Sequence, residues 1–125
     1  MGVHWDVQVT GSLQTDHIVS QAFCSALPVR YTQIPSARWA SFASLVLEGA
    51  DEATIWAAVL NAHRSGSNTV FLTWLGGGAF GNQESWIHDA IRRALRIVLA
   101  WDLDVRLVSH RTPSRAITDL VGEFD

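Results

Sequence analysis

The stretch TVFLTWLGGGAFGN, residues 69–82, decides the fold. Its first half, Thr69 to Leu75, is a continuous run of β-branched, aromatic and aliphatic residues, typical of a strand covered on both faces at the centre of a sheet. Three consecutive glycines follow, and beyond Asn82 the apolar residues recur at helical spacing from Trp86 to Val98. The stretch therefore predicts a buried strand, a glycine-rich turn and an amphipathic helix that Asn82 caps.

Upstream of this stretch, the sequence predicts two strands and a long helix. Residues 6–10 (DVQVT) alternate in polarity, and residues 17–27 (HIVSQAFCSAL) form a mostly apolar run that a proline closes. Apolar residues at three- and four-residue steps predict a helix over 36–64, with a kink or a break at Gly49. Gly66 supplies the stop signal for this helix.

Downstream, residues 104–109 (DVRLVS) alternate and predict a strand, and Thr112-Pro113 begins a last short helix that Gly122 ends. This alternation of strands and helices predicts an α/β fold with three layers, a mainly parallel sheet and helices on both faces. A chain of 125 residues is expected to form a single domain over residues 1–125.

Composition excludes several classes of function. Nine basic against twelve acidic residues give a formal net charge of -3, which argues against nucleic acid as a partner. All nine basic residues are arginines, which rules out Schiff-base lysine chemistry and the lysine of the Walker loop. Charged residues make up only 17%, against roughly 25% in an average domain, so we expect some apolar surface to meet a partner.

Cys24 is the single cysteine, so no disulfide can form within the chain and a reducing compartment is the simpler interpretation. The five histidines show no paired ligand spacing, and we expect no metal site and no cofactor. The sequence shows neither a signal peptide nor a spanning helix, which predicts a cytoplasmic protein without a membrane partner.

The glycine loop, Gly76 to Asn82, carries the clearest chemical pattern in the chain. It lies between a strand and the N-terminus of a helix, where unobstructed amides and the helix dipole favour an anion. The alternative is a structural turn that lets strand and helix pack closely. Because three consecutive glycines are costly for a turn alone, the pattern favours an anion or nucleotide site.

Two known phosphate motifs fit this loop poorly. The Walker pattern requires a lysine after its last glycine, whereas Asn82 stands there. Gly76, Gly78 and Gly81 match the dinucleotide pattern G-x-G-x-x-G, but the acid expected to end the next strand is missing. Binding of an NAD-type dinucleotide therefore stays a more remote alternative.

A third motif is a resemblance to a known family. Residues 70–82, VFLTWLGGGAFGN, with the apolar pairs that follow, resemble the second phosphate-binding segment of macrodomains, particularly of the poly(ADP-ribose) glycohydrolase branch. The segment HIVSQAFCSALP also resembles the strand that ends near a proline before the long helix of these domains. The resemblance covers about residues 17–110 and implies a macrodomain-like fold.

The resemblance implies a binding site for ADP-ribose, free or on an ADP-ribosylated protein. The amides of Gly77, Gly78, Ala79 and Gly81 would hold the diphosphate, and Phe80 would lie against the distal ribose unless it packs in the core. Ser25 and Ala26 are secondary candidates, because they fall where the neighbouring strand opens onto the cleft. The full candidate site is Gly76, Gly77, Gly78, Ala79, Phe80, Gly81, Asn82, Ser25 and Ala26.

The N-terminal half of a macrodomain has no counterpart in this sequence. That half supplies the adenine-binding acid and a first glycine loop, which carries paired glutamates in the glycohydrolases. Glu84 follows the second loop and is expected to be an ordinary acid in the first turn of a helix. Hydrolysis of an ADP-ribosyl bond therefore has no assigned catalytic residue.

Two classes of function remain open. The first is binding of ADP-ribose or a related diphosphate nucleotide, and the second is a non-catalytic, oligomerising interaction module. Without an N-terminal half, the sheet would expose a hydrophobic parallel edge, which natural proteins normally cover. We therefore expect a homo-oligomer or a second chain that completes the fold.

Overall fold

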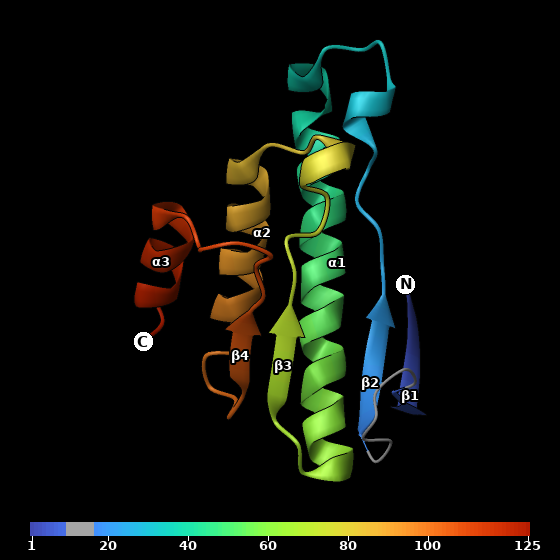
Figure 1. The fold of residues 1–125 in the computed structure, drawn as a ribbon, viewed down its shortest axis with the longest axis vertical. Helices are drawn as coiled ribbons and strands as arrows, with labels where there is room; N and C mark the ends of the chain where they lie inside the picture. Colours follow the sequence, from blue (N-terminus) through green and yellow to red (C-terminus); the bar gives the residue numbers. More distant parts are fainter. Residues whose placement is uncertain (10–16) are drawn as a thin grey trace.

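The computed structural model describes residues 1–9 and 17–125 (Figure 1). Along the chain the elements are β1 (Gly2–Gln8), β2 (Ile18–Phe23), the 3-10 turn η1 (Val29–Tyr31), α1 (Ser36–Ser65), β3 (Thr69–Leu72), the 3-10 turn η2 (Gly78–Phe80), α2 (Glu84–Ile97), β4 (Asp104–Leu107) and α3 (Arg115–Gly122).

β1 and β2 form an antiparallel pair, with Gly2 opposite Phe23 and Gln8 opposite Ile18. The register shifts between these ends, close to Asp6, whose φ of 53° is left-handed. The predicted strand over 6–10 begins four residues earlier, and position 10 lies outside the described residues. The predicted strand over 17–27 is shorter and ends at Phe23.

β3 and β4 form a parallel pair, with Thr69 opposite Asp104 and Leu72 opposite Leu107. Parallel strands require a crossover connection, which α2 provides. At one end of the pair the Asp104 amide donates to Asn68 O at 2.9 Å, and at the other the Val108 amide donates to Leu72 O at 2.8 Å. The ladder therefore extends slightly beyond both strands.

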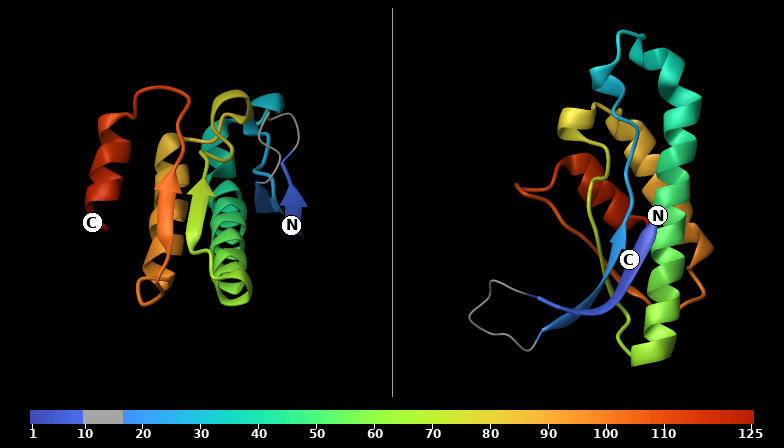
Figure 2. Two further views of the ribbon diagram at one scale, coloured as in Figure 1. Left: turned by 60° about the horizontal axis from the view of Figure 1, so that its bottom comes forward. Right: turned by 90° about the vertical axis from the view of Figure 1, so that its right-hand side faces the viewer.

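The expected three-layer fold with a mainly parallel sheet is wrong. The strands form two separate two-stranded sheets, β1–β2 and β3–β4, and among the described residues β2 and β3 do not pair. α1 and α2 pack along each other on one side of β3 and β4, while α3 packs beside α2 (Figure 2). Among the described residues, no helix covers the other face of the strands (Figure 2).

The apolar run from residue 69 to residue 75 explains why this prediction failed. Only Val70 and Leu72 point toward the helices, whereas the side chain of Phe71 is 63% exposed on the opposite face. Trp74 and Leu75 have left the strand and pack against the core from the following turn. A run of apolar residues therefore does not distinguish a strand buried on both faces from a half-exposed strand followed by a buried turn.

α1 runs without a break through Gly49, so the predicted interruption does not occur. Gly49 is exposed, and a Cβ added there would meet no atom within 4 Å. Leu47 and Ile55, on either side of it, are fully buried, and their burial outweighs the roughly 1 kcal/mol cost of a helical glycine. Gly66 ends the helix with a left-handed φ of 81°, as its position predicts.

The core lies between the two long helices, one face of β3 and the inner side of α3. Its buried members are Ala26, Leu47, Ile55, Val59, Val70, Leu72, Ile87, Ala90, Ile91, Ala94, Val98 and Leu120. In the described part of the chain, no helix is both long and apolar enough to cross a membrane.

Two predicted helix caps are also wrong. Gln83, not Asn82, occupies the N-cap position of α2, and no side chain caps that helix. Ser114 caps α3 by accepting a hydrogen bond from the Ile117 amide at 3.4 Å, so Thr112-Pro113 lies just before the helix.

Candidate functional site

The glycine loop, residues 76–82, connects the turn after β3 to α2 and contains η2. Three of its glycines have left-handed backbone, with φ of 84° at Gly76, 56° at Gly78 and 73° at Gly81. A Cβ on Gly76 would lie 2.5 Å from the Cβ of Ala26, whereas a Cβ on Gly78 would meet nothing within 4 Å. Gly76 is therefore required by packing as well as by backbone geometry, and Gly78 by backbone geometry alone.

Asn82 fastens this loop to the segment that follows β2. Its side chain is only 7% exposed, and its Nδ2 donates to Leu27 O at 2.8 Å and to Gly76 O at 3.0 Å. Its backbone amide also donates to Gly76 O, at 3.0 Å. The buried amide thus closes the loop on itself, which explains why this asparagine does not cap α2.

The backbone amides of the loop divide into two groups. Those of Gly77 and Gly81 donate within the loop region, to Trp74 O at 3.3 Å and to Gly78 O at 3.2 Å. Those of Gly78 and Ala79 have no acceptor among the described residues, and both residues are exposed. Two of the four amides expected to hold a diphosphate are therefore free to do so without breaking an internal bond.

η1 lies beside η2 and brings two side chains to the loop (Figure 1). The Arg30 side chain packs so close to Gly81 that a Cβ on this glycine would lie 2.8 Å from the Arg30 Cβ and 3.2 Å from its Nε. Arg30 has no carboxylate partner among the described residues. Its charge is therefore available to an anion on the loop.

The aromatic ring of Phe80 is half-buried against the core and meets Tyr31 edge-on, with ring centroids 6.3 Å apart and planes at 87°. Tyr31 itself is exposed.

The two secondary candidates lie on the chain beside the loop. The Ser25 hydroxyl donates to Ala26 O at 3.0 Å, and Ala26 is buried beneath Gly76. Ala26 thus has a packing role in this arrangement.

Glu84 and His88 lie next to each other on α2, just beyond the loop. Glu84, in the first turn of α2, lies 3.4 Å from His88 Nε2, measured from its Oε1. The His88 ring is buried against Trp74, with ring centroids 4.9 Å apart. Within residues 1–9 and 17–125, no group of three histidine, cysteine or acidic side chains could hold a metal ion.

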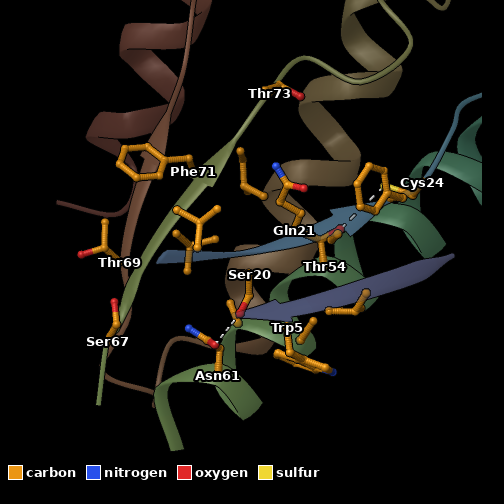
Figure 3. Close-up of a pocket in the computed structure, with 18 of the residues that line it drawn as sticks. Trp5, Ser20, Gln21, Cys24, Thr54, Asn61, Ser67, Thr69, Phe71 and Thr73 are labelled. Atoms are coloured by element: carbon orange, nitrogen blue, oxygen red, sulfur yellow. Dashed lines mark hydrogen bonds between the residues drawn. The ribbon is translucent and has the colours of Figure 1, made fainter. Parts of the chain in front are cut away.

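A second feature, a groove of about 810 Å³, runs between β2 and β3 with α1 at its back (Figure 3). We call it the interstrand groove. Polar side chains of β2, α1 and the β3 region line it. Two hydrogen-bonded contacts join α1 to β2 and to the residue that follows β2. Ser20 Oγ donates to Asn61 Oδ1 at 3.0 Å, and Cys24 Sγ lies 3.8 Å from Thr54 Oγ1.

Asp51 lines the end of the interstrand groove that also carries Cys24 and Leu75. The residue is 5% exposed, and its carboxyl has no hydrogen-bond or ion-pair partner among the described residues. Burial raises the pKa of this carboxyl from 3.8 to about 7, because desolvation penalises the charged form. A buried acid without a partner is unusual in a folded protein.

Sequence reasoning missed Arg30, Asp51 and the interstrand groove. Asp51 follows Leu47 by four residues, but neither residue belongs to the apolar spacing that predicts the helix, so the sequence did not indicate its burial. Arg30 stands two residues beyond the proline that closes the predicted strand, a position that indicates a loop but not which loop it approaches.

No family model, no curated protein and no solved structure matches the chain significantly. The interpretation of both regions therefore depends on their own geometry.

Proposed function

We propose that the chain binds ADP-ribose, or a related nucleotide with a diphosphate, through the glycine loop. The strongest support comes from the amides of Gly78 and Ala79 beside the guanidinium of Arg30. Within residues 1–9 and 17–125, these amides have no acceptor and this guanidinium has no carboxylate partner. Backbone amides and arginine are the groups that proteins use most often to hold phosphate oxygens. The partly exposed rings of Tyr31 and Phe80 give a sugar or a base an adjacent surface.

We propose that the chain binds the nucleotide but does not hydrolyse it. Glycosidic hydrolysis requires an acid or base placed beside the bond that breaks. Glu84 lies against His88 instead. An ADP-ribosylated protein is a ligand of the same chemistry, with the diphosphate on the loop and the protein outside it.

Calorimetry with ADP-ribose and AMP tests the assignment. ADP-ribose should bind more tightly, because the free amides can hold two phosphates and the aromatic pair can contact the second ribose. Arg30→Gln should weaken ADP-ribose binding at least about tenfold, since a charged hydrogen bond contributes roughly 1.5–3 kcal/mol. Arg115→Gln, on the exposed side of α3, removes the same charge and should change the affinity little. Equal affinity for both nucleotides would refute the proposal.

A second candidate is a non-catalytic interaction module. Large apolar side chains are exposed on the strand region, among them Ile18, Phe23, Phe71 and Val108. Exposed apolar residues in such number are typical of a surface that meets a partner.

A further inference from the structure

The interstrand groove is bordered by two strands, each of which pairs on one side only as far as the described residues show. β2 pairs with β1, β3 pairs with β4, and the arrows of β2 and β3 point the same way in Figure 1. Asn68 O and Leu72 O accept hydrogen bonds from β4. Because backbone groups alternate in direction along a strand, those of Thr69 and Phe71 point to the opposite edge, into the groove.

The size of the groove matches a single strand. One residue of a packed strand occupies about 160 Å³, from a rise of about 3.3 Å, a strand spacing of about 4.8 Å and a layer thickness of about 10 Å. The groove volume of about 810 Å³ thus corresponds to roughly five residues. The bordering strands have similar lengths, six residues in β2 and four in β3.

We propose that a second polypeptide, different from this chain, inserts an extended segment of about five residues between β2 and β3. The inserted strand pairs through its backbone with both borders and joins the two sheets into one five-stranded sheet. This inference deepens the interaction-module function and does not depend on the diphosphate proposal, because no residue of the glycine loop lines the groove.

A second copy of this chain fits the groove poorly. The inserted strand needs both of its edges free, since it has a neighbour on either side. Within the described residues, each of β1, β2, β3 and β4 already has one edge paired. A second copy would have to break one of these pairs before it could donate any of these four strands.

The lining of the groove indicates which side chains the inserted strand carries. Toward α1 it meets Ala57 and Ala58, which leave room for branched apolar side chains. At one end it meets the buried carboxyl of Asp51, which has no partner in the described part of the chain and favours a cationic side chain. On the open face it lies beside Phe71 and Ile18, which favour apolar side chains there too.

A labelled peptide tests the proposal directly. The probe is the seven-residue peptide VTVKVTV with blocked ends, titrated with the full chain by fluorescence anisotropy. The peptide should bind, and its analogue N-methylated at the three central residues should bind at least tenfold more weakly, because it lacks the donors for the strand edges.

Phe71→Pro should also weaken peptide binding at least tenfold. It removes one backbone donor from the groove edge of β3 but none that bonds to β4. Phe71→Val, which keeps the amide and the strand propensity, should bind within about threefold of the unmodified chain. Amide spectra of β4 and of the glycine loop show whether the β3–β4 pair and the rest of the fold survive in Phe71→Pro.

Two kinds of result would overturn the inference. One is no peptide binding at 1 mM, or equal binding by the N-methylated peptide or by the folded Phe71→Pro chain. The other is a free chain that sediments as a dimer and becomes a monomer with Phe71→Pro, which would identify a second copy as the occupant.

Discussion

The glycine loop and the interstrand groove meet at residues 75 and 76, but they differ in how far hydrogen bonds of this chain close them. In the loop, the side-chain amide of Asn82 donates two hydrogen bonds, and the backbone closes over it. In the groove, the Asp51 carboxyl has no partner among the described residues, and two strand edges face each other unpaired. Hydrogen bonds within this chain thus close the loop, although Asn82 Oδ1 is a buried acceptor without a partner among the described residues. The groove instead has the features of a surface that another segment completes.

The largest expected effect concerns Asp51 and the pH dependence of stability. Its pKa is about 7 in the folded chain and near 3.8 when unfolded, so the unfolded chain ionises first as the pH rises. The stability that the neutral carboxyl contributes is complete below pH 4 and is lost as the pH rises through 7. Relative to Asp51→Asn, the free energy of unfolding of the natural chain should fall by roughly 4 kcal/mol between pH 4 and pH 8.

Urea unfolding of both chains at a series of pH values measures this difference. The other titrating groups are common to both chains and largely cancel in the comparison. A difference that does not change with pH would show that Asp51 reaches solvent, and the contrast between groove and loop would lose its main support.

The next largest loss of stability is expected in the loop, where two glycines with similar backbone dihedral angles can be compared. Gly76→Ala should lower the free energy of unfolding by about 3 kcal/mol, because the left-handed strain adds to a clash with Ala26 and Asn82. Gly78→Ala should cost only about 1 kcal/mol, since its Cβ meets open space. Thermal unfolding of the two variants side by side measures the difference. Equal costs would mean that the loop is not packed against the segment after β2.

The smallest expected effect comes from replacing one asparagine in each region. Asn82→Ala should cost about 2 kcal/mol, because it leaves the Leu27 carbonyl without its donor. Asn61→Ala, on the groove side of α1, should cost less than about 1 kcal/mol, because Asn61 is half-exposed and water can replace its contact with Ser20. If chemical denaturation gave the reverse order, the groove and not the loop would be the rigid region.

The positions of the elements could be predicted closely, because each depends on its own residues. The helix predicted over 36–64 is observed as α1, Ser36–Ser65, since helical periodicity and the glycine stop are local properties. β3 begins at Thr69 as predicted, and α3 ends at Gly122. The boundaries failed where a distant contact decided them, as at Asn82, whose side chain bonds to Leu27 instead of capping α2.

The candidate site could be predicted only in part, for the same reason. The glycine pattern located the loop, but Arg30 reaches Gly81 only because η1 and η2 lie together. The groove could not be predicted, because the sequence pattern does not distinguish Asp51 from the other acids. Only the packing of α1 places Asp51 beside the space between β2 and β3.

The sequence by itself determined the order of strands and helices and the position of the glycine loop. It did so because hydrophobic period, capping and glycine placement act within a few residues. Only the tertiary structure decided that β2 and β3 remain apart and that one face of the strands stays open. Strands pair when residues far apart along the chain come together, which no local pattern specifies. An apolar face indicates that it will be covered, but it does not indicate which segment or partner covers it.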